Sequence, residues 1–185
     1  MAKGVAVGAI EFSSVAIGYQ TLDVMLKEAT ITLLMARPIS PGKFLVVYSG
    51  KVADVETAMD LARSRGGESV VDFLTVASVC QALFPALLES VALPDGKIGA
   101  LGVIETNSAV SAFIAADHAG KASNATLYRI NVTKSMGGKG LLLIVGSFSD
   151  VQIAVEAGSN ALQSGFLASS VVISNPEREL FTEYK

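Results

Sequence analysis

The sequence is short of several residue types on which many protein classes depend. Among its 185 residues it has no tryptophan, one cysteine, Cys80, and one histidine, His118. A single cysteine excludes an intramolecular disulfide, and its apolar neighbours predict a buried, inert thiol. A single histidine excludes a metal site built on two imidazoles. No nucleophile, base and oxyanion-binding group can be assembled from the remaining residues, so we expect no catalytic residue, no metal and no cofactor, and a protein that is not an enzyme.

Charge and long apolar runs are also scarce. Charged residues make up 17% of the chain with a formal net charge of −3, and the few aromatics are not interleaved with Arg or Lys, so nucleic acid is not an expected partner. The hydrophobic content is 51%, yet the longest apolar runs (44–48 and 141–145) are far shorter than the roughly 18 residues that span a bilayer. We therefore expect a cytoplasmic protein without membrane association. Its apolar excess predicts a surface covered by partners.

The chain contains an internal duplication. A shift of 94 gives eight identities in the 27 positions from Val7 to Leu33. After a two-residue insertion the shift becomes 96, and it aligns Gly42 and Lys43 with Gly138 and Lys139. A period near 95 is longer than the roughly 20 to 50 residues of solenoid repeats, so the sequence predicts two copies of a small domain. The first eight identities pair Gly8, Ile10, Glu11, Ser14, Asp23, Lys27, Thr32 and Leu33 with Gly102, Ile104, Glu105, Ser108, Asp117, Lys121, Thr126 and Leu127.

Each copy has the same pattern of apolar periodicity. A strand at its start is followed by a helix, capped by Ser14 in the first copy, then by a hairpin, a second helix and a last strand. This order predicts an α/β (α+β) fold of two tandem ferredoxin-like β-α-β-β-α-β domains. We place the domains at residues 4–90 and 98–185, joined by the linker 91–97 with its Pro-Asp-Gly turn.

Two motifs that suggest binding chemistry have simpler interpretations. The Gly-Lys loops "RPISPGK" (37–43) and "KSMGGKG" (134–140) lead into strands, whereas a phosphate-binding P-loop leads into a helix. Glu11 and Glu105 recur without a second acid or nucleophile, which favours a structural hydrogen-bonding role. Asp23 and Asp117 precede Lys27 and Lys121 by four residues, the spacing of a helical ion pair.

Three segments of the second copy, "ALGVIET", "AADHAGKASNATL" and "GSFSDVQIAVEAG", have matching segments in the first copy, "AVGAIEF", "TLDVMLKEATITLL" and "SGKVADVETAMDLA". In these motifs, and from about Val5 to Pro176, the chain resembles the bacterial microcompartment shell domain. Two copies in one chain resemble the tandem-domain class, above all its member from propanediol-utilisation compartments. The resemblance implies a homotrimer that imitates a hexamer, assembles with other shell proteins in a flat layer, and locates to the compartment shell.

The resemblance also implies roles for particular residues. In the family the hairpin loops surround the symmetry axis, where they form a pore for small metabolites, and a lysine near the end of the first helix lies at the edge between oligomers. Lys27 and Lys121 match the edge lysine. The residues that match the pore loops are Ile39, Ser40, Pro41, Ser135, Met136 and Gly137.

The chain departs from the family pattern at one of the loop positions that the resemblance assigns to the pore. The tandem protein of propanediol-utilisation compartments has a cysteine where this chain has Ser40, and three such thiolates hold an iron–sulfur cluster. A serine hydroxyl is not a usual ligand of such clusters, so we do not expect one here. Two alternatives to a structural shell role remain at this point: an electron conduit or cluster carrier at the trimer axis, and a trimeric regulator that binds a small molecule.

Overall fold

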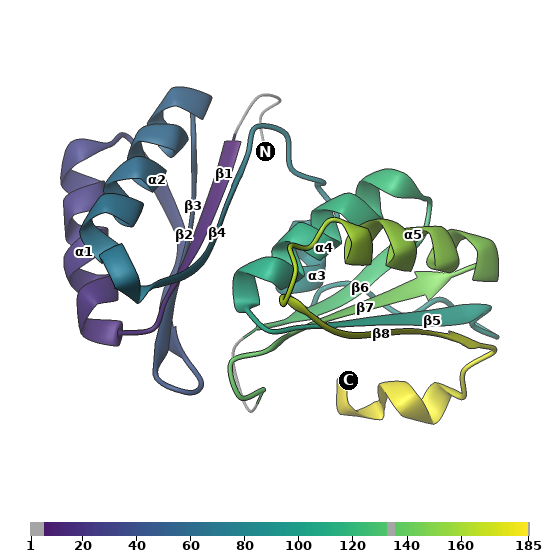
Figure 1. Cartoon of the computed structure of the whole chain (residues 1–185). Coiled ribbons are helices and arrows are strands. Elements are labelled where there is room, and N and C mark those ends of the chain that lie inside the picture. The colour runs from purple at the N-terminus through teal and green to yellow at the C-terminus, as the bar shows by residue number, and fades with distance from the viewer. Residues whose placement is uncertain (1–5, 133–135, 185) are drawn as a thin grey trace. The chain divides into compact units, whose positions relative to one another are not determined.

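The computed structural model describes residues 6–132 and 136–184, the last three of these by their backbone only. The chain divides into two compact units, of which the first ends at Val79 and the second begins at Cys80 (Figure 1). Two short segments later in the chain, 108–110 and 136–138, are grouped with the first unit.

The first unit has the predicted order of strands and helices. Its elements are β1 Ala6–Phe12, α1 Val15–Glu28, β2 Thr32–Ile39, β3 Lys43–Gly50, α2 Val52–Gly66, η1 Gly67–Ser69 and β4 Val70–Val76. The strands form one antiparallel sheet in the order β2-β3-β1-β4, and α1 and α2 lie side by side on one face of it (Figure 1). This strand order confirms the ferredoxin-like prediction for the first copy.

The second unit repeats this architecture. Its elements are α3 Leu83–Leu87, β5 Ala100–Thr106, α4 Ala109–Ala122, β6 Thr126–Asn131, β7 Gly140–Gly146, α5 Phe148–Asn160, β8 Leu167–Ser174 and η2 Arg178–Tyr184. The antiparallel sheet has the order β6-β7-β5-β8, which is that of the first unit strand for strand. The predicted duplication is therefore a duplication of fold.

Local signals account for the helix limits. Ser14 is the N-cap of α1 and its Oγ accepts a hydrogen bond from the backbone N–H of Ile17 at 3.3 Å, as predicted. Ser147 makes the same type of bond to the N–H of Asp150 at 3.2 Å and begins α5. The helix α2 ends where Gly67 adopts a positive φ of 49°, which a residue without a Cβ adopts at little cost.

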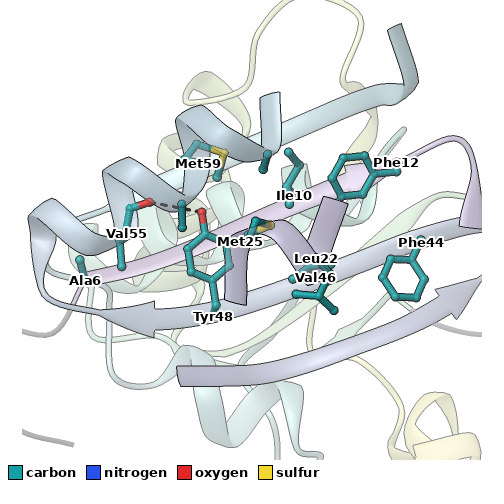
Figure 2. Packing of buried hydrophobic residues seen from close by; sticks show 12 residues of the cluster. Ala6, Ile10, Phe12, Leu22, Met25, Phe44, Val46, Tyr48, Val55 and Met59 are labelled. Atoms are coloured by element: carbon teal, nitrogen blue, oxygen red, sulfur yellow. Dashed lines mark hydrogen bonds between the residues drawn. The ribbon is translucent and has the colours of Figure 1, made fainter. Parts of the chain in front are cut away.

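The core of the first unit lies between its sheet and its helices. Figure 2 shows aliphatic and aromatic side chains from β1 and β3 that pack against α1 and α2 around Tyr48. Gly8 leaves room for this ring, because a Cβ on Gly8 would lie 2.3 Å from Tyr48 Cζ. The Tyr48 hydroxyl donates to the carbonyl oxygen of Val55 at 3.4 Å. Burial raises the pKa of Tyr48, and the negative charge of Asp60 raises it further.

The sheet of the second unit packs on both of its faces. On one face α5 contacts β5, β7 and β8. On the other face Phe181 of η2 is fully buried against the sheet, with its ring 5.6 Å from that of Tyr128 in an edge-to-face arrangement (Figure 1). The C-terminal segment is therefore part of the folded unit.

The segment after β4 belongs to the second unit. The short helix α3 contacts β6, and the backbone N–H of Cys80 donates to Asp117 Oδ1 at 2.7 Å. The domain predicted over residues 4–90 includes this segment, whereas the contacts group it with the second unit. Cys80 itself is only partly buried, which corrects the prediction of a buried thiol: it begins a surface segment and packs on α4, where a Cβ on Gly120 would lie 2.5 Å from its Sγ.

Candidate functional site: hairpin loops and helix-end lysines

The first hairpin loop, Ser40–Gly42, joins β2 to β3. The pairing of Ile39 with Lys43 leaves these three residues to make the turn, and Gly42 has a φ of 81° that favours glycine. Ser40 and Pro41 are exposed, whereas Ile39 has only 4% of its surface exposed. Of the three pore residues that the resemblance implies here, Ser40 and Pro41 are the ones with accessible side chains in the single chain.

The second hairpin loop is two residues longer in the alignment of the copies. Ser135, implied as a pore residue, lies outside the described residues. Met136 is partly buried and Gly137 is exposed. Gly137 and Gly138 have φ values of 60° and 85°, so two consecutive residues require the conformational freedom of glycine.

Gly138 lies beside the first hairpin loop. A Cβ on Gly138 would lie 3.0 Å from Pro41 Cδ and 3.1 Å from Lys43 Nζ. Gly138 is grouped with the first unit, as are Pro41 and Lys43. The structure therefore brings together part of each Gly-Lys motif, and the absence of a side chain at Gly138 permits the close approach.

The lysine of each Gly-Lys motif pairs with the recurring glutamate. Lys43 Nζ donates to Glu11 Oε1 at 2.6 Å, and Lys139 Nζ donates to Glu105 Oε1 at 2.8 Å. Within each sheet the glutamate lies opposite a leucine two residues beyond the lysine, a diagonal spacing that long side chains can bridge. These pairs confirm the structural hydrogen-bonding role predicted for Glu11 and Glu105.

Glu11 has a second partner. Its Oε2 accepts a hydrogen bond from the backbone N–H of Ala109, the first residue of α4, at 2.6 Å. The neighbouring Ser108 donates its hydroxyl proton to Asp72 Oδ2, and Asp72 lies directly opposite Glu11 in the β1–β4 register. The division of the chain groups Ser108 and Ala109 with the first unit. Two carboxylates thus hold the start of α4.

The two helix-end lysines are held by the predicted ion pairs. Lys27 Nζ lies 2.5 Å from Asp23 Oδ2, and Lys121 Nζ lies 2.6 Å from Asp117 Oδ2. Both lysines lie in the last turn of a helix, where a cation is favoured by the helix dipole. The carboxylates differ in environment: the Asp23 side chain is 61% exposed and the Asp117 side chain is 4% exposed. Asp117 also accepts a hydrogen bond from the backbone N–H of Cys80.

Two features would point to metal or membrane binding in the described part of the chain: a cluster of metal-binding side chains, or a helix that could span a membrane. No group of three or more His, Cys, Asp or Glu side chains within it is arranged to hold a metal ion. No helix in the described ranges has the length and apolarity to cross a membrane. The loop at Ser40 presents a hydroxyl, and Cys80, the one thiol of the sequence, follows β4 instead.

The lysine partners of Glu11 and Glu105 were not predicted from the sequence. The signal was present, because the glutamates recur at a shift of 94 and the lysines at a shift of 96. Ion pairs conserved between the copies would follow from that coincidence once the strand register is known. The Ala109 contact had no such signal, since it joins residues 98 positions apart.

The sequence matches a known domain family and is similar to that of a known shell protein. The BMC domain family model matches residues 6–79 and 100–176. The bacterial microcompartment shell protein PduT of Citrobacter freundii is 36% identical over 181 residues, which cover 96% of each chain. The carboxysome assembly protein CcmO of Synechococcus elongatus is 31% identical over 172 residues, which cover 86% of this chain and 61% of CcmO.

Two solved structures of microcompartment proteins have a similar fold. A microcompartments protein from Desulfitobacterium hafniense superposes with a TM-score of 0.80 at 35% identity, covering 96% of this chain and 98% of that one. The fused permuted hexameric shell protein from the RMM microcompartment superposes with a TM-score of 0.65 at 23% identity, covering 87% and 85% of the two chains, a similarity of fold.

The chain therefore belongs to the BMC domain family. With two such domains in tandem, it is a structural shell protein of a bacterial microcompartment.

Proposed function

We propose that the chain assembles as a homotrimer, in which six shell domains surround one axis, and that these trimers join other shell proteins in a flat layer. The observation that supports this most directly is the equivalence of the two copies. Strand order, the Glu–Lys pair at the hairpin and the Asp–Lys pair at the helix end all recur. Two equivalent domains per chain suit a threefold assembly that imitates sixfold symmetry.

The hairpin loops would surround the axis of this trimer. Ser40, Pro41 and Gly137 are exposed, and Met136 is partly exposed. Ile39 would support the loop from its buried position. Hydroxyls and backbone groups at an opening can replace part of the hydration of a small polar solute, so the passage would suit small polar metabolites.

The helix-end lysines would form the lateral contacts between trimers. Lys27 and Lys121 occupy matching positions in the two copies, and their side chains are 68% and 45% exposed although both are ion-paired. An exposed pair contributes little to the stability of a single chain. Both cations are therefore available to contacts with other oligomers.

Two measurements test the proposal. Light scattering of the purified protein should give the mass of three chains, and negative-stain microscopy should show flat hexagonal layers. A stable monomer at all concentrations would contradict the trimer. Trimers that bind a metabolite stoichiometrically and never form layers would favour a small-molecule regulator instead.

A further inference from the structure

Glu11 and Glu105 occupy equivalent positions but have unequal surroundings. Glu11 accepts hydrogen bonds from Lys43 Nζ and from the backbone N–H of Ala109, and its side chain is fully buried. Glu105 accepts from Lys139 Nζ, which is its one partner within the described residues, and its side chain is 33% exposed. Glu105 thus retains an accessible carboxylate oxygen, whereas the equivalent oxygen of Glu11 accepts a hydrogen bond from a helix N–H.

The donor side shows the complementary difference. Ala109 begins α4, and its counterpart at a shift of 94 is Val15, which begins α1. In the first turn of α1 the N–H groups of Ile17 and Gly18 bond to Ser14, whereas no acceptor for the Val15 N–H occurs in the described ranges. The first N–H groups of a helix have no partner inside the helix, and the positive end of its dipole favours a carboxylate.

Each chain therefore makes one hydrogen bond between a glutamate and the first N–H of a helix, from Ala109 to Glu11. The equivalent acceptor, Glu105, and the equivalent donor, the Val15 N–H, do not bond to each other within the described part of the chain. We propose that Glu105 of one chain accepts a hydrogen bond from the Val15 N–H of a second copy of this chain. The contact is heterologous, since the two surfaces that meet are different, and repetition of a heterologous contact produces a ring or a filament. The inference rests on the proposed trimer and assigns residues to the contact that closes it.

A second contact would accompany it. In the first copy Asp72, opposite Glu11, accepts from the Ser108 hydroxyl. The residue opposite Glu105 is Ser169, and the counterpart of Ser108 is Ser14. The contact between chains would therefore place two hydroxyls where the single chain has a hydroxyl and a carboxylate. Bonds between neutral groups are roughly half as strong as charge-assisted ones, so Ser169→Asp should tighten the association of chains.

Val15 permits a test that removes a single backbone N–H. Val15 is the first helical residue, where proline is well accepted, and Ser14 has φ −124° and ψ 124°, within the range that precedes a proline. Val15→Pro thus deletes the donor and keeps the helix. Val15→Ala is the matched control, because it shortens the side chain and retains the N–H.

Sedimentation velocity over a range of concentrations measures the association. Val15→Pro and Glu105→Ala should each weaken it by roughly tenfold or more, the effect of losing a hydrogen bond to a charged group. Val15→Ala should associate like the wild type, and Lys139→Met, which keeps the Glu105 carboxylate, should lose less than Glu105→Ala. Circular dichroism checks that each variant is folded.

The outcomes separate this inference from the proposed function. A wild-type protein that never associates contradicts the trimer itself. A wild-type trimer whose affinity is unchanged by both Val15→Pro and Glu105→Ala overturns the assigned contact and leaves the trimer intact. A Ser169→Asp variant that associates no more tightly than the wild type contradicts the accompanying contact between Ser14 and Ser169.

Discussion

Lys43 Nζ lies 2.6 Å from Glu11 Oε1, and the carboxylate of this pair has no exposed surface. The equivalent pair of Lys139 and Glu105 has a similar distance, 2.8 Å, but both side chains are partly exposed. The same Glu–Lys ion pair therefore occurs twice in the chain, once with a buried carboxylate and once with a partly exposed one. Because removal of one partner leaves a charge whose cost depends on burial, the two sites should respond differently to the same substitution.

Lys43→Met should destabilise the protein by roughly 3–5 kcal/mol, since it leaves the buried Glu11 without its cation. Lys139→Met is the matched comparison and should cost about 0–1 kcal/mol in the dissociated chain, where this pair is exposed. Urea unfolding of both variants at one protein concentration measures the difference. Equal losses would show that the depth of the carboxylate does not determine its dependence on lysine.

Replacement of both Lys27 and Lys121 with Asp should abolish flat layers and leave the trimer intact, because it reverses the charge of the proposed lateral contacts. Microscopy detects the layers and light scattering the trimer. Lys51 and Lys97 are exposed lysines elsewhere on the chain, and their double replacement with Asp changes the net charge equally. Layers that survive the first pair of substitutions would place the edge at other residues.

Gly8→Ala should destabilise the first unit by about 1–3 kcal/mol, because the new Cβ would lie 2.3 Å from Tyr48 Cζ and the buried ring has little room to move. Gly146→Ala in β7, the counterpart of Gly50, is the control, since its Cβ would lie in ordinary contact, 3.4 Å from Ala125 Cα. Thermal unfolding compares the two. A Gly8 variant as stable as the Gly146 variant would mean that the core of Figure 2 adjusts to the methyl group.

Tyr48 should make the protein sensitive to alkali. Its pKa is raised in the folded state, whereas the pKa of an unfolded tyrosine is about 10. Above that pH the unfolded chain releases the phenol proton and the folded chain retains it, so the free energy of unfolding falls as pH rises. Tyr48→Phe should reduce this fall, measured by urea unfolding between pH 8 and 11. An identical pH profile for both proteins would assign the alkaline loss to other groups.

Ser40→Cys should allow the protein to acquire an iron–sulfur chromophore on anaerobic reconstitution, because trimer formation would bring three thiols to the axis. The wild type, with Ser40 hydroxyls at the same position, should remain colourless under the same treatment. Absorption spectra together with iron and sulfide analysis distinguish the two. A cluster on the wild-type protein would contradict the proposed open passage, since the axis would be occupied.

The sequence was sufficient to predict the order of elements because apolar periodicity, the Ser14 cap and the Gly-Lys hairpins are local signals. The ion pairs at Lys27 and Lys121 were predictable for the same reason, as both partners lie on one helix. The burial of Ile39 and the partial exposure of Cys80 are properties of the tertiary packing, which local patterns do not encode. The Glu11 contact with Ala109 depends on tertiary structure in the same way.

The carboxylates that hold the two helix-end lysines differ in exposure, which would affect how the proposed trimers pack in a layer. Lys27 is held by an exposed Asp23, whereas Lys121 is held by an Asp117 that is also fixed to the chain at Cys80. Around the proposed ring, lysines held by an exposed carboxylate and lysines held by a buried one would alternate along the perimeter. Rotation of such a trimer by one sixth of a turn exchanges the positions of Lys27 and Lys121, and rotation by one third of a turn restores them. A neighbouring tile could therefore distinguish two orientations that a ring of six identical domains would present as one.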